Sequence, residues 1–147
     1  MTVPSPARSL SVLLVEDDTA DAMLIEEALF DRGSARTITR AEDGVAALEY
    51  LRDSLRRLPD LIILDLNMPR LNGRELLHVL KTDANLQQIP VVVLTTSSAP
   101  EDITSSYRHH ANAYVTKPVN LDDFTRAAQS IDAFYLDTVA LPPHEGR

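Results

Sequence analysis

The sequence predicts an α/β fold in which a doubly wound, five-stranded parallel sheet carries helices on both faces. Five short, mostly apolar runs alternate with five amphipathic segments along the 147 residues. The connections between them are short, and no segment repeats another. A chain of this length fits one domain with a sizeable core. Strict alternation of this kind places the strands side by side in parallel, with helices packed against the sheet from both sides.

The predicted strands are short apolar runs, as expected of strands that are covered on both faces. They lie at 10–15, 35–41, 61–65, 89–97 and 113–117. The run at 89–97 is the most apolar, and a proline is tolerated near its start. The segment 35–41 alternates only weakly between apolar and polar residues.

The predicted helices repeat apolar residues at helical spacing. They follow each strand in turn: from Asp18 or Thr19 to Gly33, then 43–58, 73–83, Pro100 to about His110, and 120–139. Leu55 is expected on the apolar stripe of the second helix, which Pro59 ends. Ser97 and Ser98 are expected to cap the fourth helix, with Pro100 at its first position.

Composition excludes several classes of function. The formal net charge of −8 argues against non-specific nucleic-acid binding, which needs a basic surface. The absence of cysteine excludes disulfides and thiolate metal sites. No apolar run approaches the roughly 20 residues of a membrane helix, and residues 1–8 are expected to be a flexible leader without the apolar stretch of a signal peptide. We therefore expect a cytoplasmic protein that contacts neither membrane nor nucleic acid directly.

Polar side chains follow four of the five predicted strands. Their residues are Glu16, Asp17 and Asp18 after the first strand, Asp65 at the end of the third, Thr95 and Thr96 in the fourth, and Lys117 at the end of the fifth. The carboxyl ends of parallel strands meet at one edge of the sheet, where this architecture binds its ligands. We therefore expect the carboxylates, hydroxyls and ammonium group to converge.

Such a set of side chains favours phosphoryl chemistry with a hard cation. Converging carboxylates repel one another unless a cation lies among them, and Mg²⁺ prefers carboxylates, waters and phosphate oxygens. An aspartate beside the metal can attack phosphorus, while Lys117 and Thr95 would neutralise the phosphoryl oxygens. Each feature alone also fits a structural role: an acidic helix cap, a turn threonine, a solvated lysine or a turn at 67–73. Their coincidence at one edge favours the functional interpretation.

Four motifs match a known family in order and spacing: VLLVEDD (12–18), DLNMPRLNG (65–73), PVVVLTTS (90–97) and AYVTKP (113–118). Over residues 10 to about 135, the sequence resembles the response-regulator receiver domains of two-component signalling. The resemblance implies a flavodoxin-like (βα)5 fold with strand order 2-1-3-4-5. It also implies that Asp65 is the phosphoacceptor, which takes a phosphoryl group from a histidine of a sensor kinase.

The resemblance assigns a metal site and a switch. Asp17 would ligate Mg²⁺ directly, together with Asp65 and the backbone carbonyl of Asn67, and Glu16 would act through water. Thr95 and Lys117 would contact the phosphoryl group. Two further residues complete the pattern: Tyr114 as the aromatic switch that follows Thr95, and Pro118 after a cis peptide bond.

The resemblance also suggests domain limits and partners. The receiver domain would cover 9–140, with a tail at 141–147 and no output domain, as in stand-alone receivers. The ending FYLDTVALP and the internal segments LTTS and ANAYVTKP look most like regulators that are paired with bacterial phytochromes, whose C-terminal segment helps to form a homodimer. The homodimer surface would comprise the fourth helix, fifth strand, fifth helix and C-terminal segment. Apolar residues that crowd the chain end fit this interface or, alternatively, fold back onto their own domain; they are Phe134, Tyr135, Leu136, Val139 and Leu141.

Three hypotheses follow. The first is a single-domain response regulator, a phosphoacceptor switch rather than an enzyme, that serves a phosphorelay or docks onto partners. The second is an aspartyl-phosphate phosphatase, because DLN resembles the two-acid motif of haloacid-dehalogenase-type enzymes; Asn67 cannot serve there as general acid or base. The third is a binding module that works independently of phosphorylation.

Overall fold

The computed structural model describes residues 10–30, 36–138 and 140–142. The predicted leader at 1–8, the helix stop at Gly33 and the side chain of Val139 lie outside these ranges. The elements follow one another as β1 (Leu10–Val15), α1 (Thr19–Phe30), β2 (Arg36–Ala41), α2 (Gly44–Leu51), β3 (Leu61–Leu64), α3 (Gly73–Thr82), β4 (Val91–Thr95), α4 (Pro100–Arg108), β5 (Ala113–Thr116), α5 (Leu121–Asp132) and a π-helical segment, η1 (Ala133–Thr138). None of the described helices is long and apolar enough to cross a membrane.

The five strands form one parallel sheet in the order β2-β1-β3-β4-β5, which confirms the predicted topology. The register aligns Val15 of β1 with Leu64 of β3, and Leu64 with Val93 of β4. The residues that follow these strands therefore reach the same edge. Because the strand order reverses between β1 and β3, the ligand-binding crevice of this architecture is expected at the ends of these two strands.

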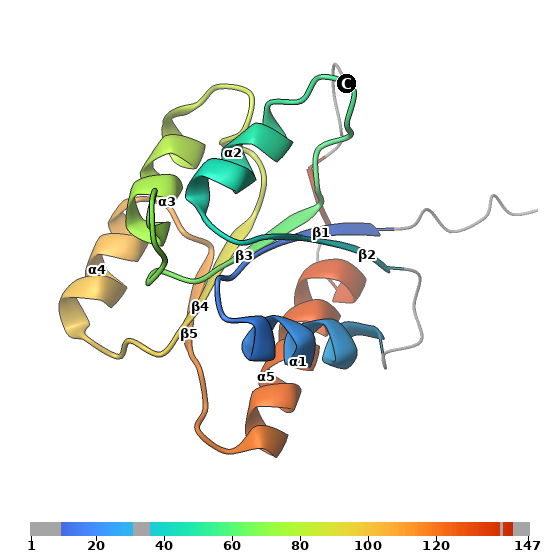
Figure 1. The fold of residues 1–147 in the computed structure, drawn as a ribbon, viewed down its shortest axis with the longest axis vertical. Helices are drawn as coiled ribbons and strands as arrows, with labels where there is room; N and C mark the ends of the chain where they lie inside the picture. Colours follow the sequence, from blue (N-terminus) through green and yellow to red (C-terminus); the bar gives the residue numbers. More distant parts are fainter. Residues whose placement is uncertain (1–9, 31–35, 139, 143–147) are drawn as a thin grey trace, which may run out of the picture.

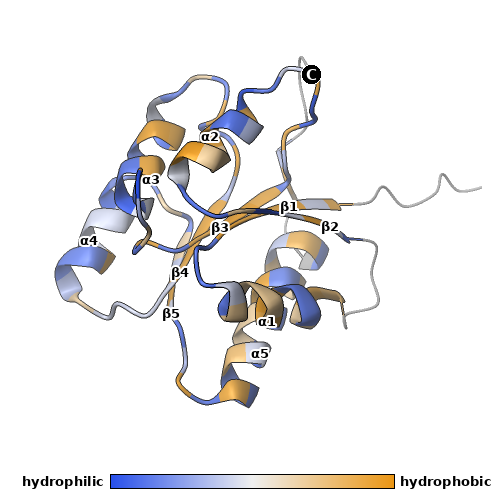
Figure 2. Cartoon of the chain, viewed as in Figure 1, coloured by the Kyte–Doolittle hydropathy of each residue, from blue (hydrophilic) through white to orange (hydrophobic). Residues whose placement is uncertain are grey.

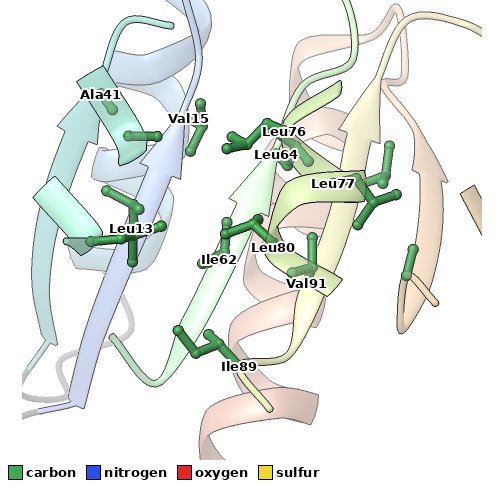
Figure 3. Close-up of a cluster of buried hydrophobic side chains, with 14 of the residues drawn as sticks. Leu13, Val15, Ala41, Ile62, Leu64, Leu76, Leu77, Leu80, Ile89 and Val91 are labelled. Carbon is green, nitrogen blue, oxygen red and sulfur yellow. The ribbon is translucent and has the colours of Figure 1, made fainter. Parts of the chain in front are cut away.

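Helices cover both faces of the sheet (Figure 1). Alternate side chains of the central strands point to opposite faces, so Leu13 and Val15 join a core cluster with α2 and α3, while Val12 and Leu14 join one with α1 and α5. Figure 3 shows the first cluster, in which leucines of α3 pack over β3. The hydropathy colouring shows the apolar character of the central strands between the helical layers (Figure 2). Full burial of each leucine contributes about 1.5–3 kcal/mol to folding.

The second helix is shorter than the sequence predicts: α2 ends at Leu51, not at residue 58. The Asp53 carboxylate accepts hydrogen bonds from the Leu55 N–H (3.0 Å) and from Arg56 Nε (3.1 Å). Side-chain bonds of this kind offer the backbone an alternative to the helix. Leu55 is 94% exposed, so its predicted place on the apolar stripe is wrong.

The fourth helix begins at Pro100 as predicted, but its cap differs. The N-cap is Ala99, which has no side chain able to cap, so the prediction that Ser97 and Ser98 cap the helix is wrong. The Ser97 hydroxyl instead donates to Asp102 Oδ2 at 2.6 Å. This bond ties the loop before α4 to the first turn of the helix.

The last helix changes its winding at Asp132. The predicted segment 120–139 is α-helical only to Asp132 and continues as η1. Asp132 and Asp137 both pair with the guanidinium of Arg36 on β2, at 2.8 and 2.7 Å. The i→i+5 bonds of a π-helix bring residues five apart onto one face, which suits two carboxylates that share one arginine.

Candidate functional site

Backbone hydrogen bonds extend the sheet into the loops that carry the predicted site residues. The Asp65 N–H donates to the Val15 carbonyl at 3.0 Å, and the Glu16 N–H donates to the Ala41 carbonyl at the same distance. The Lys117 N–H donates to the Thr95 carbonyl at 2.6 Å. The polar residues are therefore held by the strands themselves rather than by mobile loops.

Three carboxylates converge at this edge. Glu16, Asp17 and Asp65 each offer an oxygen, and these oxygens lie within 4.8 Å of one another. Glu16 and Asp65 are buried, whereas Asp17 is exposed and opens the cluster to solvent. A donor set made only of oxygen, with one open side, fits a hard divalent cation that keeps some of its waters. The Asn67 N–H donates to Asp65 Oδ1 at 3.2 Å, which places this residue beside the cluster.

Lys117 balances the carboxylate charge from inside. Its ammonium lies 2.6 Å from Glu16 Oε1, 2.8 Å from Asp21 Oδ2 and 3.3 Å from Asp65 Oδ2. An ammonium has three protons, so each one has a carboxylate partner. Burial lowers the pKa of Lys117, but hydrogen bonds to Asp21 and Glu16 outweigh it, and the net direction is upward. Lys117 is therefore a permanent cation in this site.

Glu16 experiences opposing influences. Burial raises the pKa of its carboxyl above the usual range, the hydrogen bond from Lys117 lowers it, and the charge of Asp65 raises it again. The net direction is upward, because burial is the largest of these effects. Both Lys117 and a cation bound among the carboxylates would favour the ionised form of Glu16.

Thr95 ends β4, which lies beside β3 in the sheet. It is fully buried, and no partner within the described part of the chain lies in hydrogen-bond distance of its hydroxyl. A buried polar group without a partner costs about 1–3 kcal/mol. The hydroxyl would gain an interaction if an acceptor oxygen arrived on Asp65.

Tyr114 is half-buried and packs against the first core cluster. Its hydroxyl donates to the Ser97 carbonyl at 2.8 Å, and burial raises the pKa of the phenol. Tyr114 thus contacts the loop that follows Thr95, and this contact links β5 to the end of β4.

The structure adds an ion pair that the sequence did not indicate. Arg74 of α3 makes a two-pronged contact with Asp102 of α4, at 2.9 and 2.8 Å. The hydrogen bond from Arg74 lowers the pKa of Asp102, and the bond from the Ser97 hydroxyl lowers it further. Arg74 also approaches Asn67 Oδ1 at 3.4 Å. The pair therefore links the loops that follow β3 and β4.

Asp21 is a further site residue that the sequence did not indicate. An acidic residue in the first turn of a helix is usually explained by the helix dipole, and no motif pointed to it. The one indication in the sequence was its position four residues after Asp17, near the carboxyl ends of the predicted strands.

Gly73 explains the glycine at the end of the DLNMPRLNG motif. A Cβ at this position would lie 2.1 Å from the Asp65 carbonyl oxygen and 2.5 Å from Leu66 Cα. Only glycine lets α3 begin this close to the backbone of the central aspartate. Arg70, in the same turn, has φ of 59°, a left-handed conformation that L-residues seldom adopt.

The predicted cis bond before Pro118 is wrong: no described peptide bond is cis. The trans form of a bond to proline is favoured by about 0.5–1 kcal/mol. With this bond trans, Lys117 still reaches all three carboxylates, so their contacts impose no need for the rarer isomer.

Comparison with known proteins identifies this arrangement. The model of the response regulator receiver domain matches residues 12–129. The chain belongs to this family. The receiver domain therefore accounts for most of the chain, and its members generally act as phosphoacceptor switches.

Individual relatives agree with this receiver-domain assignment. The chain is 43% identical over 137 residues to the response regulator Rcp1 of Synechocystis, covering 89% of this chain and 92% of Rcp1. The solved structure of the phosphorylated cyanobacterial phytochrome response regulator RcpA superposes with a TM-score of 0.90 at 41% identity, covering 92% of this chain and all of RcpA. The Mn²⁺-bound form of Rcp1 superposes with a TM-score of 0.87 at 41% identity, covering 91% of this chain and 99% of Rcp1. Receiver domains thus bind a divalent metal, and this chain has a matching cluster of acids.

Proposed function

We propose that Asp65 accepts a phosphoryl group from the phosphohistidine of a sensor kinase and that this changes the conformation of the receiver domain. The observation that carries the proposal is the convergence of Asp65 with Asp17, Glu16 and Lys117 at the end of β3. An Asp65 carboxylate oxygen would form a bond to phosphorus while the nitrogen–phosphorus bond breaks. The imidazole nitrogen would leave with the electron pair of that bond.

Mg²⁺ is the metal that we expect at the acidic cluster. Asp17 and Asp65 would ligate it directly, Glu16 would act through a water, and the Asn67 carbonyl would complete the protein ligands. The all-oxygen donor set and the solvent-exposed Asp17 support this choice. When bound, the ion would neutralise charge on the phosphoryl oxygens.

Lys117 and Thr95 would both contact the phosphoryl group. The Lys117 ammonium would pair with one phosphoryl oxygen, and the buried Thr95 hydroxyl would donate to another. Movement of Thr95 would loosen the contact between Tyr114 and the Ser97 carbonyl, and Tyr114 would follow it. The change would thereby reach the surface formed by α4, β5 and α5.

Labelling tests the phosphoacceptor assignment. Wild type incubated with radiolabelled acetyl phosphate and Mg²⁺ should take up one acid-stable, base-labile phosphoryl group, and Asp65→Asn should take up none. Asp122→Asn, which removes a charge from an exposed position of α5, should be labelled like wild type. Equal labelling of Asp65→Asn and wild type would show that Asp65 is not the acceptor.

The kinase partner is expected to be a histidine kinase of the bacterial phytochrome type. This follows from the similarity to RcpA, a phytochrome response regulator. Phosphotransfer profiling against a panel of purified histidine kinases measures the preference directly. Faster transfer from a kinase without a phytochrome sensor would contradict it.

A homodimer through α4, β5, α5 and the C-terminal segment is supported by exposed apolar side chains on these elements. Tyr107, Leu121 and Phe134 are each at least half exposed, although Leu136 is buried in its own domain. Phe134→Ser should therefore shift the mass measured by light scattering towards the monomer. Phe30→Ser on α1 removes an even more exposed phenylalanine from another surface and should leave the mass unchanged. A reversed result would place the interface on α1.

A further inference from the structure

Asp21 belongs to the ion cluster, although no motif assigns it. It lies in the first turn of α1, and its N–H donates to Asp18 Oδ1 at 3.0 Å, which fixes the backbone of this turn. Its carboxylate reaches inward to Lys117 Nζ at 2.8 Å and remains 28% exposed. A residue that only complemented the helix dipole would not need to contact a buried lysine.

The three contacts of Lys117 are unequal. Glu16 and Asp21 hold its ammonium at 2.6 and 2.8 Å, whereas Asp65 lies at 3.3 Å. The shortest contacts thus keep the ammonium towards β1 and α1. A phosphoryl group on Asp65 would bring about −1.5 to −2 charges and three acceptor oxygens close to the same ammonium. Lys117 can form a full contact with it only by weakening one of its present bonds.

Of the two short contacts of Lys117, the one with Asp21 can be released more easily. Glu16 is 1% exposed, so its carboxylate has little access to water if the lysine leaves. Asp21 is partly exposed, and water can replace the lost bond. The difference in burial predicts that the Asp21–Lys117 bond is the one exchanged.

We propose that Asp21 is a positioning residue that acts through Lys117 and restrains phosphorylation of Asp65. This inference rests on the proposed phosphoacceptor function. Asp21 competes with the phosphoryl oxygens for the ammonium, and the exchange of the Asp21–Lys117 bond accompanies phosphoryl transfer. Loss of the carboxylate frees Lys117 to approach Asp65 before the phosphoryl group arrives.

The test is the initial rate of labelling by acetyl phosphate at fixed Mg²⁺. Asp21→Asn should be labelled about three- to tenfold faster than wild type, because an ammonium that has lost one of its carboxylate partners can interact more strongly with the developing anion, and about 1.4 kcal/mol corresponds to one power of ten in rate. Asp18→Asn is the matched control: it removes a charge three residues away, keeps a side chain that caps helices well, and leaves Lys117 untouched. Asp21→Glu should remain within about twofold of wild type, because it restores a carboxylate.

A double-mutant cycle separates action through Lys117 from a general charge effect. In a Lys117→Gln background, the additional change Asp21→Asn should alter the labelling rate by less than about twofold. An unchanged or slower rate in Asp21→Asn, an equal acceleration in Asp18→Asn, or an acceleration that persists in the Lys117→Gln background would each overturn the inference. Labelling of wild type but not of Asp65→Asn keeps the phosphoacceptor function standing in all three cases. A wild type that takes no label would overturn both.

Discussion

Lys117 and Thr95 lie at the ends of neighbouring strands but differ in how their polar groups are paired. The side chain of Lys117 is 4% exposed, and its ammonium contacts three carboxylates, so all its donors are used. The hydroxyl of Thr95 is fully buried and has no partner among the described residues. The proposed phosphoryl group would disturb the bonds of Lys117 and supply a missing one to Thr95. The site therefore combines a fully paired cation with a polar group that lacks a partner.

Removal of the ammonium should produce the largest effect on stability. Lys117→Met leaves three carboxylates without their cation, and loss of one partner of a buried ion pair costs about 3–5 kcal/mol. Urea unfolding at pH 7 measures the change. Lys81→Met, which removes a lysine bonded to backbone carbonyls, should cost less.

The stability lost in Lys117→Met should become larger as pH rises from about 4 towards neutrality. Without Lys117, the pKa of Glu16 rises further above its unfolded value of about 4.3, because only burial and the charge of Asp65 remain. The folded state then binds more protons than the unfolded state above that pH, so stability falls as pH rises from about 4 towards neutrality. If the variant instead lost more stability relative to wild type as pH falls, this account of the ion cluster would be wrong.

Metal binding should produce the next largest effect. Mg²⁺ at about 100 times its dissociation constant should stabilise wild type by about 2.7 kcal/mol, and removal by EDTA should reverse the gain. Asp17→Asn should lose most of this stabilisation, because the expected direct ligand is removed from the cluster. Thermal unfolding with and without Mg²⁺ provides the measurement, with Asp122→Asn as a charge-matched control that keeps the full shift.

At Thr95, by contrast, removal of a polar group should stabilise the fold. Thr95→Val replaces the unpartnered hydroxyl with a methyl group of similar size and should add about 1 kcal/mol to the free energy of unfolding. Thr116→Val, at an exposed position of β5, should change it by less than about 0.5 kcal/mol. Destabilisation by Thr95→Val would show that the hydroxyl has a partner and would remove the contrast between Thr95 and Lys117.

The smallest effect is expected from the Arg74–Asp102 pair, which links α3 to α4. Arg74→Met should lower the free energy of unfolding by about 0.5–1 kcal/mol, because both side chains are partly exposed and ion pairs of this kind contribute little to stability. The pKa of Asp102 is lowered in the folded state, so the contribution is present above the unfolded pKa of about 3.9 and is lost as pH falls through the lowered value. Urea unfolding at pH 7 and pH 3 checks this, with Arg56→Met, in an exposed pair with Asp53, as the control.

Much of the site could be predicted because its residues sit at fixed positions relative to strands. Asp65 and Thr95 follow or end buried apolar strands, Lys117 follows a partly buried one, and the parallel register then brings the three together. The chemistry of acids, hydroxyl and ammonium at one edge follows from residue types alone. The strand order came from the resemblance to the receiver family.

The contacts that escaped prediction depend on side-chain direction and on residues far apart in sequence. Asp21 and Lys117 are separated by 96 positions, and Arg74 and Asp102 by 28, with no pattern that pairs them. The early end of α2 came from a side-chain bond of Asp53, which competes with a helix that the apolar spacing favours. The change of winding after Asp132 depends on a shared arginine of a distant strand.

The same long separations set the order in which the site can form during synthesis. The Lys117–Glu16 contact joins residues 101 positions apart, and the Lys117–Asp65 contact joins residues 52 apart. A nascent chain on the ribosome therefore exposes its acids well before the lysine emerges, and contacts of high sequence separation close late. Until β5 pairs with β4, Glu16 and Asp65 lack the ammonium that they contact in the folded structure. The ion cluster is therefore complete only after the last strand has joined the sheet.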